Sequence, residues 1–165
     1  MATRKPHRAG KRTGAPSGSV GHGEFVVYPG VPTGIYDVLE RLSAAAGDSP
    51  DFGTPGISLD RKRLTVRWFG PLPPAVQAVV DSAGTGFEVA VLPTDFRPGD
   101  LRAEAVRLAG EHGDVIAAAT ARPEGDGIEV LVLPAVAEDA GGAQQALAGV
   151  ASELPLLAEI GDAPS

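Results

Sequence analysis

Residues 115–133, VIAAATARPEGDGIEVLVL, read as two strands joined by a tight turn. Residues 128–133 are rich in Val, Ile and Leu, whereas residues 122–127 contain a proline, two glycines and an aspartate. An Asp-Gly pair between apolar runs favours a hairpin, because glycine accepts the positive φ that the common two-residue turns require. We therefore predict a β-hairpin over this stretch.

A second hairpin is predicted upstream at residues 57–69, ISLDRKRLTVRWF. Leu64, Val66 and Trp68 alternate with polar residues there, as in a half-buried strand. Each hairpin is followed by a helical pattern and then by one more strand, at residues 87–92 and at residues 156–160. The chain thus contains the same hairpin, helix and strand pattern twice.

The order of these elements predicts an α+β fold. Residues 87–160 alone spell β-α-β-β-α-β, which is a ferredoxin-like order. Two ββαβ-like units of this kind predict an antiparallel sheet with helices on one face. The other face would then be open, and it is a candidate docking surface for another protein, including one that adds a strand at the sheet edge.

The remaining helices and loops follow from periodicity and from Pro and Gly. Apolar residues at i, i+3, i+4 and i+7 predict a helix from Gly34 to about Gly47. A longer amphipathic helix is predicted from Leu101 to about Gly110. Residues 93–100 and 134–142 are expected to be loops, and residues 144–153 a helix.

The composition predicts one domain with tails. We divide the 165 residues into a tail at 1–23, an arm, helix and loop at 24–52, and an α+β body at 53–165. The absence of cysteine excludes disulfides and thiolate sites. Because there are also only three histidines to act as metal ligands, we expect no metal and no cofactor. No run reaches the roughly 18 apolar residues of a membrane helix.

The charge is unevenly distributed along the chain. Residues 1–23 hold five basic and no acidic residues, whereas the other residues hold nine basic and twenty-one acidic ones. The first segment is poor in apolar residues and typical of a disordered tail. It also lacks the apolar core of a signal peptide, which predicts a cytoplasmic protein. Its basic residues are candidate contacts to an anionic polymer: Arg4, Lys5, Arg8, Lys11 and Arg12.

No catalytic motif is found, and we predict that the protein is not an enzyme. There is no G-x-S-x-G elbow, P-loop or G-x-G-x-x-G after a strand. His112 beside Glu111 is better explained as a residue at a helix end than as a general base. The carboxylates Asp95, Asp100 and Glu104 do not have the spacing of a calcium loop.

One basic cluster interrupts the acidic body, at residues 61–63 and Arg67. Most such turns are solvated surface, but this one is also suited to steering an acidic partner. Phe69 follows the same strand. If it lies on the open face, it is an anchor of the kind found at interface hot spots.

Residues 53–165 resemble the pro-region of bacterial extracellular serine proteases of the alpha-lytic protease and streptogrisin type. The likeness lies in the order of elements and in the local sequence at residues 57–66, 87–92, 101–108, 122–132 and 156–164. It implies a secreted folding chaperone and inhibitor, with a sheet paired to the protease and the C-terminal tail in the active-site cleft. The partner-binding residues we predict are Phe69, Arg67, Leu156, Ile160, Asp162, Ala163, Pro164 and Ser165. The alternative is a freestanding regulatory or structural domain whose basic N-terminal arm contacts an anionic polymer.

Overall fold

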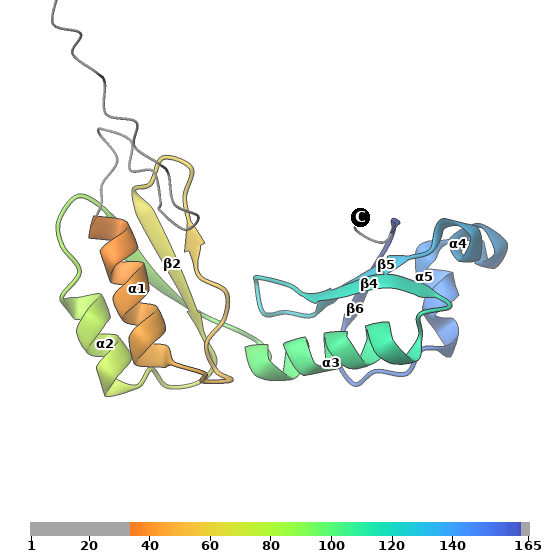
Figure 1. Ribbon diagram of the computed structural model, residues 1–165, viewed down its shortest axis with the longest axis horizontal. Coiled ribbons are helices and arrows are strands. Elements are labelled where there is room, and N and C mark those ends of the chain that lie inside the picture. The colour runs from red at the N-terminus through yellow and green to blue at the C-terminus, as the bar shows by residue number, and fades with distance from the viewer. Residues whose placement is uncertain (1–33, 163–165) are drawn as a thin grey trace, which may run out of the picture.

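The computed structural model describes residues 34–162, which form an α+β fold (Figure 1). The predicted tail at 1–23 and residues 24–33 lie outside the described part. The first unit contains α1 (Gly34–Ala46), β1 (Gly56–Ile57), β2 (Arg63–Trp68), α2 (Pro74–Asp81) and β3 (Glu88–Pro93). The second contains α3 (Pro98–Glu111), β4 (Ile116–Ala121), β5 (Ile128–Val132), α4 (Pro134–Ala140), α5 (Ala143–Ala146), the 3-10 turn η1 (Leu147–Gly149) and β6 (Leu156–Ile160). The predicted internal repeat is confirmed, and each copy is preceded by a helix.

Each unit builds its own three-stranded sheet, and the two sheets have the same topology. In the first, β2 pairs antiparallel with β1 and parallel with β3. In the second, β5 pairs antiparallel with β4 and parallel with β6. A helix that crosses over the sheet returns the chain to its starting end, so the next strand runs parallel. The expected antiparallel sheet is therefore wrong, because both sheets are mixed.

The expected ferredoxin-like arrangement of residues 87–160 is also wrong. It would require β3 to join β4, β5 and β6 in one sheet. Instead β3 pairs with β2 along its whole length, from Arg63↔Glu88 to Trp68↔Pro93. The short crossover through α2 keeps β3 beside β2, so the second unit starts a new sheet.

The first hydrophobic core lies between α1, α2 and one face of the first sheet. Alternate residues of β2, Leu64, Val66 and Trp68, are buried in it. Helix α1 buries the stripe that its periodicity predicts. Helix α1 is thus part of this core, although the sequence division placed it outside the body.

The second core repeats this pattern with α3, α4 and η1. Ile128, Val130 and Val132 of β5 are fully buried, and they pack with Leu101 and Leu108 of α3. At ~25 cal/mol per Å2 of apolar surface, each such side chain stabilises the fold by roughly 1.5–3 kcal/mol. Each sheet therefore has helices on one face and none on the other (Figure 1).

Three helices differ from the predicted boundaries, and prolines explain two of the differences. Pro98 and Pro134 occupy the first turns of α3 and α4, where the missing N–H costs nothing. Residues 98–100 and 134–140, predicted as loops, are therefore helical. Gly141 ends α4 with φ 81°, in the left-handed conformation that glycine favours. The predicted helix at 144–153 is shorter and consists of α5 followed by η1.

The two units meet where the chain passes from β3 into α3. The amide of Gly99 donates to the carbonyl of Pro50 at 2.7 Å, and the amide of Phe96 donates to the carbonyl of Gly125 at 3.0 Å. The first bond joins α3 to the loop before β1. The second joins the interunit linker to the turn of the β4–β5 hairpin, which points toward the first unit in Figure 1. The angle between the units is therefore fixed by contacts on both sides of the linker.

Candidate functional site

The helix-free face of the first sheet lies at the junction of the units. Arg67 and Phe69 alternate with buried Trp68, so they point away from the first core. The Cβ of Arg67 lies 2.9 Å from the Cβ position that Gly53 would have, and a Pro98 side-chain atom lies 3.5 Å from the same position. The face that carries Arg67 therefore looks toward α3.

Phe69 contacts a cation at the end of the interunit linker, just before α3. The guanidinium of Arg97 lies 5.5 Å from the centroid of the Phe69 ring. The same guanidinium pairs with Asp51, with Nε 2.8 Å from Oδ1. The cation–π contact between Arg97 and Phe69 is worth about 0.5–1 kcal/mol at an exposed site. Phe69 is thus half-buried at the junction and partly occupied by a contact within the chain.

Arg67 and Arg102 have no carboxylate partner among residues 34–162. Arg102, in the second turn of α3, donates from Nη1 to the carbonyl of Phe52 at 3.2 Å. For Arg67 the structure shows neither a side-chain hydrogen bond nor an ion pair to any described residue. A guanidinium presents five N–H donors in a planar fork that suits carboxylates. Both side chains therefore have donors that no residue within 34–162 accepts.

A fourth arginine, Arg122, lies at the start of the β4–β5 turn. Its Nε lies 3.1 Å from Asp126 Oδ1 and 3.6 Å from a Glu124 oxygen, so its charge is compensated locally. We call this group the junction arginines: Arg67, Arg97, Arg102 and Arg122. They are four of the nine basic residues outside the first twenty-three residues of an acidic protein.

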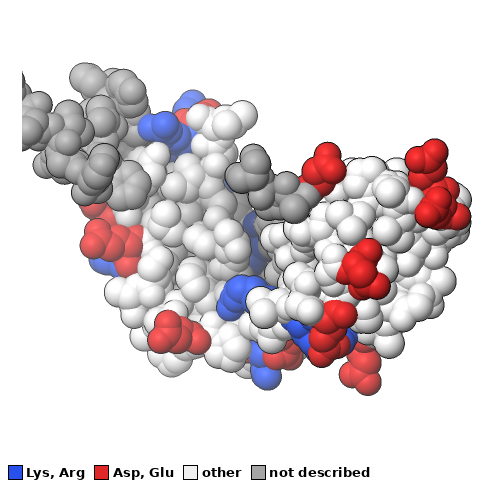
Figure 2. All heavy atoms as spheres, turned by 45° about the vertical axis from the view of Figure 1, so that its right-hand side comes forward, with Lys and Arg blue, Asp and Glu red and all other residues white. Residues whose placement is uncertain are grey.

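Figure 2 shows a hollow between the two units, with basic side chains in it and acidic side chains spread over the second unit. A pocket of about 150 Å3 at this junction is lined by both units, with Gly53 and Thr54 on one side and Thr120 and Arg122 on the other. Small-molecule sites usually measure about 300–1,000 Å3. This pocket is smaller than that, and a more open depression of about 360 Å3 beside it is lined by Gly53, Thr54 and Arg102.

The helix-free face of the second sheet mixes apolar and acidic residues. The residues that alternate with the buried ones on β5 are Glu129 and Leu131. Their register partners on β6 are Leu157 and Glu159. This face is on the opposite side of the sheet from α3 (Figure 1). The two open faces therefore differ in charge, since the first carries arginines and the second carries glutamates.

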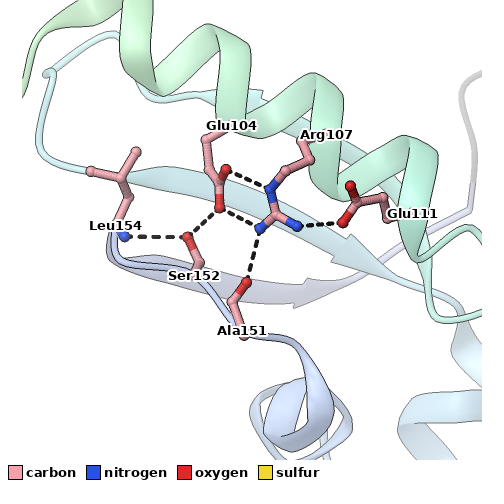
Figure 3. Close-up of polar contacts among 6 residues, drawn as sticks. All are labelled: Glu104, Arg107, Glu111, Ala151, Ser152 and Leu154. Atoms are coloured by element: carbon pink, nitrogen blue, oxygen red, sulfur yellow. Dashed lines mark hydrogen bonds and ion pairs between the residues drawn. The ribbon is translucent and has the colours of Figure 1, made fainter.

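The strongest polar network lies on the outer side of α3 and is drawn in Figure 3. Arg107 donates to both carboxylate oxygens of Glu104, at 2.8 and 2.6 Å, and also to Glu111. Arg107 reaches the carbonyl of Ala151 at 2.9 Å, and the Ser152 hydroxyl donates to Glu104 at 2.7 Å. These bonds tie α3 to the segment that leads into β6.

The same network shifts the ionisation of Glu104. The hydrogen bonds from Arg107 and then from Ser152 lower the pKa of the Glu104 carboxyl from 4.5 to about 2. Its side chain is 18% exposed. A lowered pKa at a packed ion pair indicates a structural role for Glu104. The open surface groove beside it, of about 860 Å3, is lined by these same paired groups.

The other candidate residues from the sequence, three carboxylates and one histidine, lie along α3 and the linker before it. Asp95 lies in the interunit linker and Asp100 in the first turn of α3, whereas Glu104 is committed to Arg107. Within the described part of the chain, no three acidic or histidine side chains gather where they could hold a metal ion. His112 is the C-cap of α3, and its amide donates to the carbonyl of Leu108.

The partner-binding residues proposed from sequence fall into three groups. Arg67 and Phe69 lie at the junction. Leu156 and Ile160 are the first and last residues of β6, a strand at the edge of the second sheet, and Asp162 follows it in an exposed position. Residues outside the described part of the chain are Ala163, Pro164 and Ser165, with Arg4, Lys5, Arg8, Lys11 and Arg12.

Sequence reasoning missed three of the four junction arginines. Arg97 and Arg102 are five residues apart, and Arg122 lies twenty residues further on. Each has two acidic residues within four positions of it, so no local basic cluster signals them. Pro98 signals that Arg97 and Arg102 lie at the start of one helix, but it does not signal that this end of α3 faces the junction. Arg122 required knowledge of where the hairpin turn docks.

Comparisons with protein-family models, with curated proteins and with solved structures found no match for the chain. Within residues 34–162, no helix is both long and apolar enough to cross a bilayer. The relation to protease pro-regions stays a prediction.

Proposed function

We propose that the protein is a non-catalytic binding module for another protein, and that its partner places an acidic segment in the interunit hollow. One observation carries this proposal: Arg67 and Arg102 have guanidinium donors without a partner among residues 34–162, although acidic residues outnumber basic ones in the chain. Local carboxylates neutralise Arg97 and Arg122. A guanidinium binds a carboxylate through two parallel, charge-assisted hydrogen bonds, and these are among the stronger ones in proteins.

The apolar surroundings add contact area to this charge. Phe69 lies beside the arginines, and Leu92 of β3 is 44% exposed on the same side of the sheet. Aromatic residues and arginines are the types enriched at interface hot spots. An extended segment with an acidic residue next to an apolar one fits these neighbours.

The proposal is tested by selecting peptides from a displayed random library with the full chain. We expect enrichment of peptides that contain Asp or Glu beside an apolar residue, with binding that weakens as salt is raised. The double variant Arg67→Gln, Arg102→Gln should lose this enrichment. Arg63→Gln is the matched control, because Arg63 lies on the same strand but pairs with Glu88 at 3.2 Å. Enrichment that is absent, or equal for all three proteins, would refute the proposal.

The resemblance to pro-regions makes serine proteases the first natural partners to test. We expect a trypsin-like or chymotrypsin-like protease to lose activity when it is mixed with an excess of the protein. The same protease should keep its activity when it is mixed with the double variant instead. Unchanged protease activity at high excess would remove the inhibitor version and leave the binding module to be judged by the peptide selection.

A further inference from the structure

The free edges of the two sheets are not equally protected against pairing with another strand. The strand orders place β1, β3, β4 and β6 at the edges. An unpaired edge attracts other strands, and proteins limit this with short edge strands, bulges, prolines or charges. Strand β1 has two residues, and β4 has a register irregularity between Ile116 and Ala118. Both edges are therefore poor templates.

A proline blocks the edge at β3. The amide of Glu88 donates to the carbonyl of Lys62, just before β2, and the amide of Thr94 donates to the carbonyl of Trp68, the last residue of β2. Because amides alternate in direction along a strand, residues 89, 91 and 93 point their backbone groups outward. Residue 93 is a proline, which has no N–H to offer. An incoming strand would lack one of the donors that it needs here.

Strand β6 has five residues with no proline and no register irregularity, and Glu159 is the one charge on it. The carbonyl of Pro155 accepts from Ile128, and the amide of Gly161 donates to Val132. Odd-numbered residues of β6 therefore face β5, and Leu156, Ala158 and Ile160 point their N–H and C=O groups outward. All three carry an N–H. Leu157 and Ile160 are 38% and 60% exposed, so an edge that no strand within residues 34–162 pairs with also exposes apolar side chains.

The repeat makes the contrast between β3 and β6 direct. The last register pair of the first sheet is Trp68↔Pro93, and the last pair of the second sheet is Val132↔Ile160. Ile160 thus occupies the position that holds the blocking proline in the first unit. The same architecture is closed at one edge and open at the other.

We propose that the open edge of β6 pairs antiparallel with β6 of a second copy of this chain, about a two-fold axis at Ala158. In this register Leu156 lies opposite Ile160 of the other copy, and Ala158 lies opposite itself. All three outward residues of each strand are then in hydrogen-bonded pairs. The two sheets join into one sheet with β6 of each copy at its centre.

The charges of β6 favour this register and this occupant. Glu159 lies opposite Leu157 of the other copy, so like charges are not directly opposed. A shift that places the axis at Glu159 would put two carboxylates face to face and would engage fewer outward groups. A shift that places it at Leu157 also pairs fewer of them. The strand is therefore complementary to itself in the register that makes the most hydrogen bonds.

The association is tested by sedimentation of the full chain over a dilution series, with Ile160→Pro as the first variant. We expect the mass to rise from that of the 16.8 kDa chain toward twice that value as concentration increases. Ile160→Pro copies the block found at β3 and should weaken association at least ~10-fold, which corresponds to ~1.4 kcal/mol. Val91→Pro is the matched control, since it removes an outward N–H from β3 and should leave association unchanged.

Hydrogen exchange gives a second and more specific reading. Amides of Leu156, Ala158 and Ile160 should gain protection with concentration, whereas those of Leu157 and Glu159 should be protected throughout. Ile160→Lys serves if the proline variant does not fold, since a charge opposite Leu156 also opposes pairing. A chain that stays monomeric up to ~1 mM, or a dimer that both variants leave intact, overturns the proposal. Pairing of β6 with a different protein by a monomeric chain overturns it as well.

Discussion

The amide of Phe96 donates a hydrogen bond of 3.0 Å to the carbonyl of Gly125, and this bond fixes the linker between the units to the turn of the second hairpin. Gly125 has φ 74°, and a Cβ added there would overlap the side chain of Thr94. Glycine is therefore required at this turn for two separate reasons, backbone conformation and close approach.

Gly125→Ala should destabilise the protein by about 2–5 kcal/mol, the sum of left-handed strain and overpacking. Gly70→Ala is the matched control, because Gly70 has φ 76° but nothing within 4 Å of an added Cβ. It should cost about 1–2 kcal/mol. Urea unfolding of both variants measures the difference, which is the contribution of the contact with Thr94. Equal losses would show that the hairpin turn does not press on the linker.

A second contact of the junction is tested by a pair of glycines on one helix. A Cβ at Gly99 would lie 2.6 Å from the Cβ of Pro50, whereas a Cβ at Gly110 meets nothing within 4 Å. Gly110→Ala should stabilise α3 by about 0.5–1 kcal/mol. Gly99→Ala should instead destabilise the protein by about 1–3 kcal/mol. Thermal unfolding gives the two signs, and stabilisation by Gly99→Ala would mean that α3 can move away from the loop before β1.

The duplicated hairpins could be predicted from the sequence because the signals for them are local. Alternation over residues 64–68 and the turn before Ile128 specify strands and their faces without reference to the rest of the chain. The choice of partner strand is not local. The same β-α-β-β-α-β order suits one ferredoxin-like sheet or two separate sheets, and it is the packing of α2 beside β2 that decides between them.

Helix α4, which lies where a loop was predicted, has a local signal for a helix at each of its ends. Pro134 at its start and Gly141 after its end are the residues that favour those two positions, and Pro74 and Pro98 begin α2 and α3 in the same way. The junction arginines could not be predicted in this manner. Their proximity depends on the docking of α3 and of the hairpin turn, which no stretch of sequence encodes alone.

The ion pairs of Glu104 should make stability depend on acidity. The folded pKa is about 2 and the ordinary value is 4.5, so the unfolded chain binds a proton first as pH falls. The stabilisation is fully present above pH 4.5 and is lost between pH 4.5 and about 2. Glu104→Gln should cost about 1 kcal/mol at pH 7, after allowance for solvent screening, and less at pH 2.

Urea unfolding of both proteins at several pH values measures this dependence. Glu88→Gln is a suitable control, since Glu88 also pairs with an arginine but its side chain is 63% exposed. Its variant should lose little at any pH. A loss for Glu104→Gln that stays the same from pH 7 to pH 2 would contradict the assigned role of the carboxylate.

The block at β3 should be removable, which follows from the proposed pairing of β6. Pro93→Ile restores an outward N–H to β3, where Val91 is already 38% exposed. Residues 89, 91 and 93 can then all pair antiparallel with a second copy about Val91. A chain with two open edges links each copy to two others, so sedimentation should show species larger than a dimer.

The double variant Pro93→Ile, Ile160→Pro separates edge pairing from general stickiness. It exchanges the proline between the two units, so association should return to a dimer that now joins β3 to β3. Hydrogen exchange should then show concentration-dependent protection at Val89 and Val91 and none at Ala158. In Pro93→Ile the outward N–H groups of β3 equal those of β6 in number. If this variant leaves the assembly unchanged, or if protection in the double variant stays on β6, the proline is not what closes the edge of the first sheet.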